Sequence, residues 1–225
     1  MLMRHLGLIF VLMASTAAAT SHAAVIISEI MYEAAGADDD REWVELYNTS
    51  ALPVDISGWR LYDEDAGSQP GAPIPSSTTL GAYQAIVLIE HEATFLADWG
   101  SGINYIVYPG MGTALNMANT ATAVGDEVIT LADSGGGIVD QVDYANSAPW
   151  PSVTNATATA IYLLPNKLDA ADNDLGASWA RSTSGIHGAR LASGRIDAGS
   201  PGVVVPEPTA IGLALAALGF VRRRR

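Results

Sequence analysis

Short apolar runs, separated by clusters of Gly, Pro, Asn, Asp and Ser, dominate the chain between residues 24 and 202. The runs are rich in β-branched and aromatic residues, and such short runs are typical of β-strands. The predicted strands lie within residues 24–32, 41–50, 52–63, 83–89, 103–110, 125–133, 137–146 and 158–164.

Several of these runs carry more detailed patterns. In the second run Val44 and Leu46 alternate with Glu45, which predicts a half-buried strand with one polar side. The runs 125–133 and 137–146 flank the sequence SGGG and predict a hairpin with a flexible loop.

Other segments depart from the strand pattern. Gly58 predicts a bulge or bend inside the third run. Residues 91–99 have helical spacing and end at Gly100, and the Ala/Thr-rich segment 112–124 predicts no definite structure. The run 158–164 is the last predicted strand.

Seven or more short strands with little helix and no βαβ alternation predict an all-β fold, an antiparallel β-sandwich. No period of about 20–50 residues repeats, so the pattern excludes a solenoid or a propeller.

The first 23 residues, MLMRHLGLIFVLMASTAAATSHA, have the three parts of a secretion signal. Arg4 provides the positive start, residues 6–14 the apolar core of a signal helix, and Ala23 the signal cleavage position. The core is shorter than the about 20 residues that a spanning helix requires. We therefore expect an exported chain, and because it has no cysteine, its fold does not depend on disulfides.

The last residues read PEPTAIGLALAALGFVRRRR. Pro206, Glu207 and Pro208 precede an uncharged run, 209–221, that predicts a short C-terminal hydrophobic helix, marginal as a permanent membrane span. Four arginines follow and would stay in the cytoplasm as a stop signal: Arg222, Arg223, Arg224 and Arg225.

This tail resembles the PEP-CTERM sorting signal. The resemblance implies transient anchoring in the inner membrane and processing by an exosortase-type membrane enzyme, after signal peptidase has removed the leader. The cell envelope or the extracellular matrix would then be the destination. A plain tail anchor and a basic nucleic-acid-binding tail are the alternatives, and export disfavours the second.

The charge of the exported part is strongly negative. The whole chain has a net charge of −13, and residues 24–205 alone hold 23 acidic and six basic residues, a net charge of −17. Such a charge repels nucleic acid and anionic lipid, and it favours cations, cationic partners or solubility.

The body of the chain resembles the bacterial lamin-tail-like domain. The resemblance depends on the order of several motifs: ISEIMY, EWVELYNTS, VDISGWRLYD, GDEVITLADSGGGIVDQVDY, Trp150-Pro151 and GSPG. It implies an immunoglobulin-like sandwich with a binding role and no shared catalytic residues. The predicted organisation is a signal peptide, 1–23, a lamin-tail-like domain, 24–202, and a sorting signal, 203–225.

No catalytic residue is predicted. His91 and His187 lack a nearby nucleophile motif and are interpreted as loop residues. Glu42 and Glu45 could form an acid/base pair, but we interpret them as a cap and a solvent-facing strand residue. The absence of cysteine excludes thiolate chemistry and Cys-ligated metal sites.

Acidic loops supply the oxygen ligands that calcium prefers. They are Asp38–Asp40, Asp63–Asp65 and the loop with Asp169, Asp172 and Asp174. An EF-hand counted from Asp172 would place Ala177 and Thr183 where glycine and glutamate are required. We interpret the loops as solvated, predict no cofactor, and keep the last three aspartates as candidate ligands for a structural calcium ion.

The five tryptophans are spread along the chain and are interpreted as core or rim residues, with a sugar-stacking platform as the alternative. They are Trp43, Trp59, Trp99, Trp150 and Trp179.

These observations together favour an exported, non-catalytic module that binds or scaffolds extracellular polysaccharide or matrix protein. The alternatives are a divalent-metal-dependent hydrolase of extracellular polymers and a bulk matrix component without a specific ligand.

Overall fold

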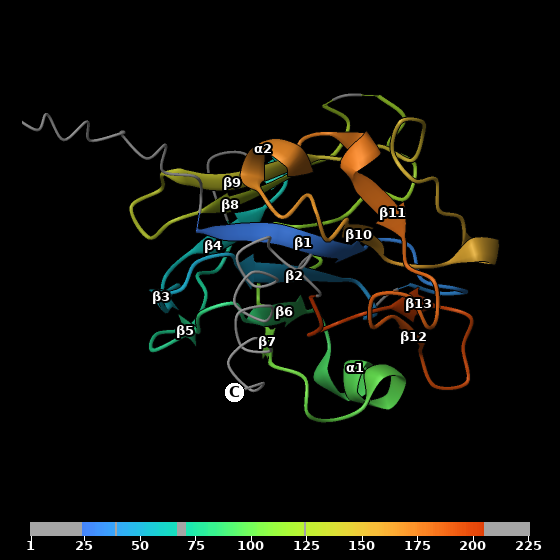
Figure 1. The fold of residues 1–225 in the computed structure, drawn as a ribbon, viewed down its shortest axis with the longest axis horizontal. Coiled ribbons are helices and arrows are strands. Elements are labelled where there is room, and N and C mark those ends of the chain that lie inside the picture. The colour runs from blue at the N-terminus through green and yellow to red at the C-terminus, as the bar shows by residue number, and fades with distance from the viewer. Residues whose placement is uncertain (1–23, 39, 67–70, 124, 205–225) are drawn as a thin grey trace, which may run out of the picture.

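The computed structural model describes residues 24–38, 40–66, 71–123 and 125–204 (Figure 1). The predicted signal peptide with Ala23, the Pro206–Pro208 motif, the apolar run and the terminal arginines lie outside the described residues. No helix among the described residues is long and apolar enough to cross a membrane.

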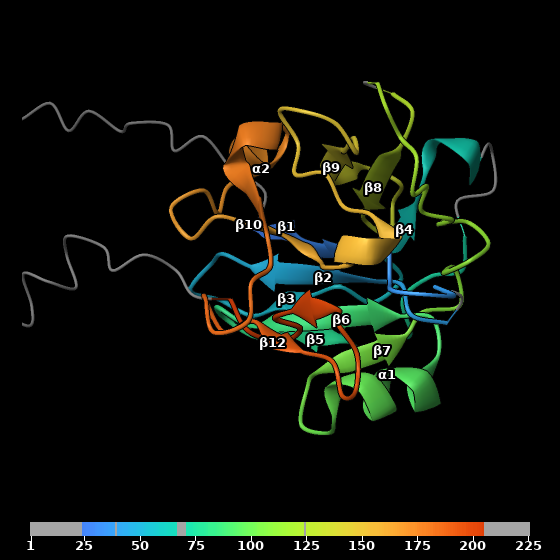
Figure 2. The same ribbon diagram turned by 90° about the vertical axis from the view of Figure 1, so that its right-hand side faces the viewer.

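A six-stranded sheet forms the centre of the molecule. Its strands, in spatial order, are β11 (Trp179–Arg181), β10 (Ile161–Leu163), β1 (Val25–Met31), β2 (Trp43–Asn48), β6 (Ala85–Ile89) and β7 (Tyr105–Val107). A three-stranded sheet consists of β4 (Arg60–Tyr62), β8 (Val128–Ala132) and β9 (Ile138–Asp143). In Figures 1 and 2, β8 and β9 lie beside β1, whereas α1 (Glu92–Trp99) lies beside β7. The predicted all-β fold is confirmed in this form: the regular structure is mostly strand, and the strands form several sheets.

Smaller elements surround the two sheets. β3 (Val54–Asp55) pairs with β5 (Thr79–Leu80), and β12 (Arg190–Leu191) pairs with β13 (Ala198–Gly199). The remaining helical elements are short: η1 (Glu64–Ala66), η2 (Asn155–Thr157), α2 (Ala170–Asn173) and η3 (Gly176–Ser178).

Several local predictions are confirmed. The hairpin of β8 and β9 forms, and the Asp133 carboxylate accepts hydrogen bonds from the backbone of Gly135 and Gly137 at its tip. Gly58 bends the third run into β3 and β4, at a φ of 77° that few other residues adopt. The helix α1 begins after His91 and ends at Gly100, as its spacing predicts.

The prediction of a purely antiparallel fold is wrong at one edge. β6 and β7 pair in parallel, and α1 makes the crossover between them. A parallel pair requires such a connection, because the chain must return to the starting end of the sheet. The run 158–164 is the last clear strand in the sequence, and three further strands that the pattern does not predict, β11, β12 and β13, follow it in the structure. These strands have only two or three residues, too few for a periodic signal.

The main core lies between the two large sheets. Val44 and Leu46 of β2 point into it together with Leu61, Ile129 and Leu131 of the smaller sheet, and all five are fully buried. The segment 112–124, for which the sequence predicts no structure, contributes buried side chains from Leu115 and Met117 to this core.

The opposite face of the six-stranded sheet, here called the outer face, is also covered. Trp43, Met31 and Val87 pack there against Phe95 and Trp99 of α1. The prediction that β2 is half-buried with a polar side is therefore wrong, since all six of its residues are buried. Segments that come more than 40 residues later in the sequence cover its second face.

The two sheets are also joined by one buried carboxyl group. Asp140 of β9 accepts hydrogen bonds from the Ile27 backbone N–H at 2.7 Å and from Asn173 Nδ2 at 2.7 Å. The pairing of β1 with β2 shifts register between Ile27 and Glu29, which marks a β-bulge. β10 pairs with β1 only at Glu29 and Ile30, so Asp140 satisfies a backbone donor of β1 that lies beyond the end of that pairing.

Candidate functional site

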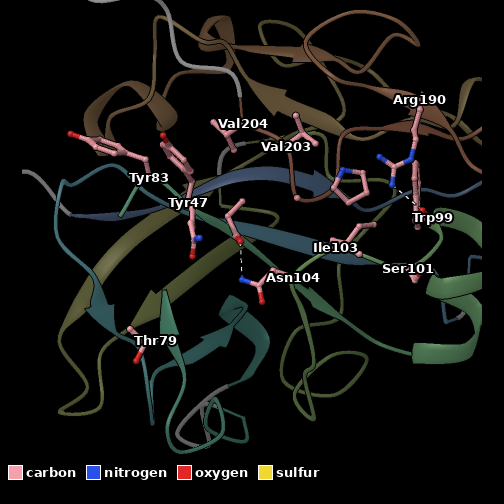
Figure 3. A pocket seen from close by; sticks show the side chains of 15 residues that line it. Tyr47, Thr79, Tyr83, Trp99, Ser101, Ile103, Asn104, Arg190, Val203 and Val204 are labelled. Atoms are coloured by element: carbon pink, nitrogen blue, oxygen red, sulfur yellow. Dashed lines mark hydrogen bonds between the residues drawn. The ribbon is translucent and has the colours of Figure 1, made fainter. Parts of the chain in front are cut away.

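An open groove of about 930 Å³ lies on the outer face of the six-stranded sheet. Its walls come from the end of β2, the turn before β6, the loop after α1, β12 and the segment 201–204. Figure 3 shows Tyr47 and Tyr83 at one end, Arg190 and Trp99 at the other, and Asn104 and Ile103 between them. Binding sites for ligands typically have volumes of about 300–1,000 Å³.

The backbone fixes the orientation of the groove residues. Tyr83 has a φ of 54° in the turn before β6, and its N–H donates to the Ser50 carbonyl at 3.3 Å. The Asn104 side chain donates to the Ala85 carbonyl at 3.0 Å, which ties the loop before β7 to β6. Hence hydrogen bonds hold these turn and loop residues of the groove against neighbouring segments.

The aromatic rings of the groove differ in accessibility. The Tyr83 side chain is 60% exposed, whereas Trp99 is only 7% exposed because its ring packs edge-on against Trp43, with 5.9 Å between centroids. Burial raises the pKa of the Tyr47 hydroxyl, and the neighbouring Tyr83 raises it further. The exposed stacking surface is therefore a tyrosine.

The tryptophans themselves are packing residues. Trp150 and Trp179 pack together at the end of the main core, with ring centroids 5.8 Å apart, and Trp59 is partly buried against the same core. The interpretation of the tryptophans as core or rim residues is confirmed.

The groove has a charge unlike that of the rest of the chain. Among the described residues that line it there is no carboxylate, and Arg190 is the one charged side chain. The Arg190 guanidinium donates to the Trp99 carbonyl at 2.9 Å and lies 5.8 Å from the centre of the Trp99 ring. The remaining lining consists of uncharged donors and acceptors and of small apolar residues.

Two buried glutamates lie beneath the wall of the groove. Glu29 and Glu45 are cross-strand partners on β1 and β2, and each is 1% exposed. Glu29 accepts hydrogen bonds from the Ser182 hydroxyl at 2.8 Å and from the Ser200 backbone and hydroxyl at 2.9 and 2.7 Å. Together these contacts hold residue 200 against the sheet.

Glu45 continues this arrangement toward the groove. Its carboxyl group accepts from the Ser28 hydroxyl at 2.8 Å and from the Gly202 N–H at 2.7 Å. Gly202 lines the groove, so the two glutamates position the wall formed by residues 200–202. The interpretation of Glu45 as solvent-facing is wrong, because the later segment covers the face to which it points.

Burial disfavours the charged form of both glutamates. Desolvation raises the pKa of Glu29, although its hydrogen bonds with Ser200 and Ser182 and the charge of Arg190 oppose the shift. Desolvation likewise raises the pKa of Glu45, and the neighbouring Glu29 raises it further. The cavity beside the pair measures about 20 Å³, room for a single water molecule. The pair thus supports the wall of the groove.

The other candidate acid/base residues are placed as follows. Glu42 lies apart from this pair, at the start of β2, and lines a small polar pocket with Asp38 and Glu90. His91 caps α1, where its Nδ1 accepts from the Thr94 N–H. The structure does not bring His91 and His187 to one site, and the His187 ring contacts Tyr162.

The candidate calcium ligands mainly stabilise their own loops. Asp169 caps α2 by accepting from the Ala171 N–H at 2.9 Å, and Asp172 forms an ion pair with Lys167 at 3.1 Å. Asp174 follows the helix, and burial raises its pKa. Within residues 24–38, 40–66, 71–123 and 125–204, no three acidic or histidine side chains are arranged to hold a metal ion.

The remaining acidic loops follow the same principle. The Asp63 carboxylate accepts from the Asp65 and Asn116 backbone at 3.0 and 2.6 Å, and Glu64 accepts from the Val128 N–H at 2.7 Å. Asp38 accepts from the Asn119 side chain at 2.5 Å. Asp63 and Glu64 thus accept hydrogen bonds from backbone N–H groups, and Asp38 accepts one from a side chain. Sequence spacing does not reveal these roles.

Sequence reasoning missed most of the groove. Tyr47, Tyr83, Asn104 and Arg190 come from four separate segments, and only Tyr47 belongs to one of the motifs quoted above, EWVELYNTS. The one available signal was the isolated Arg190 in a strongly acidic chain.

Comparisons with known proteins agree with the fold. The family model of the lamin tail domain matches residues 18–146, a span that contains β1 to β9. In comparison with curated proteins the chain has no match. Strands β10 to β13, which complete the six-stranded sheet and one wall of the groove, follow the matched residues. The chain therefore belongs to the lamin tail domain family.

Proposed function

We propose that this protein is an exported, non-catalytic binding and scaffolding module of the cell envelope or extracellular matrix, and that the groove is its binding site. The observation that carries the proposal is the groove itself: an open surface with an exposed tyrosine, an arginine and uncharged hydrogen-bonding groups. Membership of a family of non-catalytic, immunoglobulin-like domains supports a binding role.

The chemistry of the groove suits a sugar polymer. Tyrosine rings provide a flat apolar face for a sugar ring, and amides and hydroxyls such as Asn104, Ser101 and Thr79 can bind sugar hydroxyls. An open groove also gives a polymer more access than a closed pocket would.

Delivery is the second part of the proposal. A signal peptide ending at Ala23 would export the chain, and the Pro206–Pro208 motif with its apolar run would direct exosortase-type processing. Mass spectrometry of the protein from its native envelope tests this: we expect a mature chain that begins at Ala24 and lacks Arg222–Arg225. Recovery of the chain with both ends intact would contradict it.

Binding is tested by affinity electrophoresis of the purified protein in gels with polygalacturonate, carboxyl-reduced polygalacturonate or dextran sulfate. We expect saturable retention by at least one polymer, and Tyr83→Ala should weaken it about tenfold, the effect of losing one well-packed aromatic contact.

The matched control is Ile138→Ala, which removes an equally exposed apolar side chain (63%) from β9, in the smaller sheet. This variant should bind like the wild type. Equal losses in both variants, or no retention of the wild type by any of the polymers, would show that the groove is not a polysaccharide site.

A further inference from the structure

Arg190 differs from most other basic side chains of the described domain in its partners. Arg41 pairs with Asp98 at 3.3 Å, Arg195 with Asp197 at 2.5 Å and Lys167 with Asp172 at 3.1 Å. Arg190 instead donates to a neutral carbonyl, and no described carboxylate lies within ion-pair distance of it. In a domain with 23 acidic residues, Arg190 thus forms no direct ion pair, and its charge acts only at longer range on the buried Glu29.

The guanidinium is held in place at the Trp99 end of the groove (Figure 3). One nitrogen donates to the Trp99 carbonyl, and the Trp99 ring lies beneath the group. A guanidinium has five N–H donors in a rigid plane, so donors remain after this contact. A planar, fixed guanidinium is well suited to bind a carboxylate through two parallel hydrogen bonds.

The surroundings favour an anion at this position. None of the described groove residues is acidic, and the nearest acidic influence is Glu29, which is 1% exposed and bonded to Ser182 and Ser200. The domain's overall negative charge repels an anion, but at physiological ionic strength salt largely screens exposed charges that are more than about 8 Å away. The charge nearest to the anion, that of Arg190, therefore determines whether an anion binds at this end of the groove.

We propose, on the basis of the function proposed above, that the groove binds a carboxylate-bearing polysaccharide, a polyuronate, whose carboxylate pairs with Arg190. The sugar ring bearing that carboxylate lies over the Trp99 end of the groove. A neighbouring ring of the same polymer stacks on Tyr83, and Asn104 and Ser101 bind the hydroxyls between them.

The test compares two polymers that differ in the carboxylate alone. Affinity of the purified protein is measured for polygalacturonate and for its carboxyl-reduced, uncharged form, with a chelator present so that divalent cations do not bridge carboxylates. We expect Arg190→Gln to weaken binding of polygalacturonate about tenfold and to change binding of the reduced polymer by less than about twofold. Added salt should weaken binding of polygalacturonate alone.

Two further variants control for charge and folding. Arg181→Gln makes the same change of charge on β11, which is one edge strand of the six-stranded sheet, whereas β7 is the other. This variant should bind polygalacturonate and its reduced form as the wild type does. Arg190→Lys keeps the charge but loses the planar fork, so its affinity for polygalacturonate should lie between those of the wild type and Arg190→Gln. Thermal unfolding of each variant confirms that it is folded.

The outcomes separate the two proposals. Equal binding of both polymers by the wild type, or equal losses for both in Arg190→Gln, overturns the polyuronate assignment and leaves polysaccharide binding intact. If dextran sulfate binds as tightly as polygalacturonate and its binding also depends on Arg190, the groove is a general anion site, and this result would also overturn the polyuronate assignment. Absence of binding to any polymer contradicts both proposals.

Discussion

Glu29 and Glu45 face each other across β1 and β2, two like acids buried side by side in the centre of the sheet. Like charges opposite one another normally destabilise a strand pair. Here the pair is tolerated because five hydrogen bonds from residues 28, 182, 200 and 202 satisfy its oxygens. Since these donors come from segments far apart in the chain, the pair ties the C-terminal part of the domain to its first two strands.

The first prediction concerns the pH dependence of stability. Burial raises the pKa of Asp140 to about 7 and that of Glu127 to about 8, and it also raises the pKa values of Glu29 and Glu45. An acid with a raised folded-state pKa binds more protons in the folded state, so its contribution is complete below its unfolded pKa and is lost as the pH rises.

We therefore expect the melting temperature to fall between about pH 5 and pH 8, by about 2–4 °C for each kcal/mol lost. Circular dichroism at closely spaced pH values and constant ionic strength measures this. A melting temperature that is flat or rises over the interval would show that these acids are ionised in the folded protein.

The second prediction assigns part of this pH dependence to the glutamate pair. Glu45→Gln removes one ionisable group, while its amide can accept from the Gly202 N–H and donate to the Ser28 hydroxyl. Because the repulsion between the two acids is gone, the melting temperature should fall less steeply with pH than in the wild type. Glu92→Gln, on the exposed surface of α1, is the control and should keep the wild-type slope.

The third prediction concerns the same wall of the groove. Glu45→Ala removes the carboxyl group that accepts from the Gly202 N–H and from the buried Ser28 hydroxyl, which should cost about 1–3 kcal/mol. Urea unfolding measures the free energy, and the loss should exceed that of Glu45→Gln at pH 6. Equal stability of the two variants would mean that the contact with Gly202 does not hold the wall.

The fourth prediction concerns Asp140, which joins β9 to β1. Asp140→Ala leaves the Ile27 N–H and one of the two N–H groups of Asn173 Nδ2 without an acceptor, because the other can still donate to the Ile27 carbonyl, at a cost of about 1–3 kcal/mol for each lost bond. Asp140→Asn retains an oxygen for both donors and should be clearly the more stable of the two variants. If both variants unfold at the same urea concentration, then Asp140 does not join the sheets as described.

The fifth prediction concerns the packing of the outer face. A Cβ at Gly199 would lie 3.0 Å from both the Trp43 and the Trp99 ring. Since neither of these packed rings can move freely, Gly199→Ala should destabilise the protein by about 1–3 kcal/mol. Gly135→Ala, at the exposed tip of the β8–β9 hairpin, should cost less, and a reversed order in thermal unfolding would contradict the packing described here.

Local sequence patterns were sufficient for elements that repeat a period or end at a distinctive residue. Alternation and β-branched content predicted β1, β6, β8 and β9, Gly100 marked the end of α1, and SGGG marked the hairpin. The order of several such segments also indicated the family. These signals depend on neighbours in the chain, and therefore they can be read without the fold.

Contacts between distant segments decided the rest. Glu45 looks like a solvent-facing residue because strand alternation cannot show that residues 200–202 will cover it. The groove depends on the same cause, since Tyr83 and Arg190 line one groove only because β12 packs over the outer face, far from Tyr83 in the sequence. The sequence by itself thus determined the strands and the family. Only the tertiary structure decided which polar side chains are buried and which form a site, because burial depends on the packing of segments that no local pattern connects.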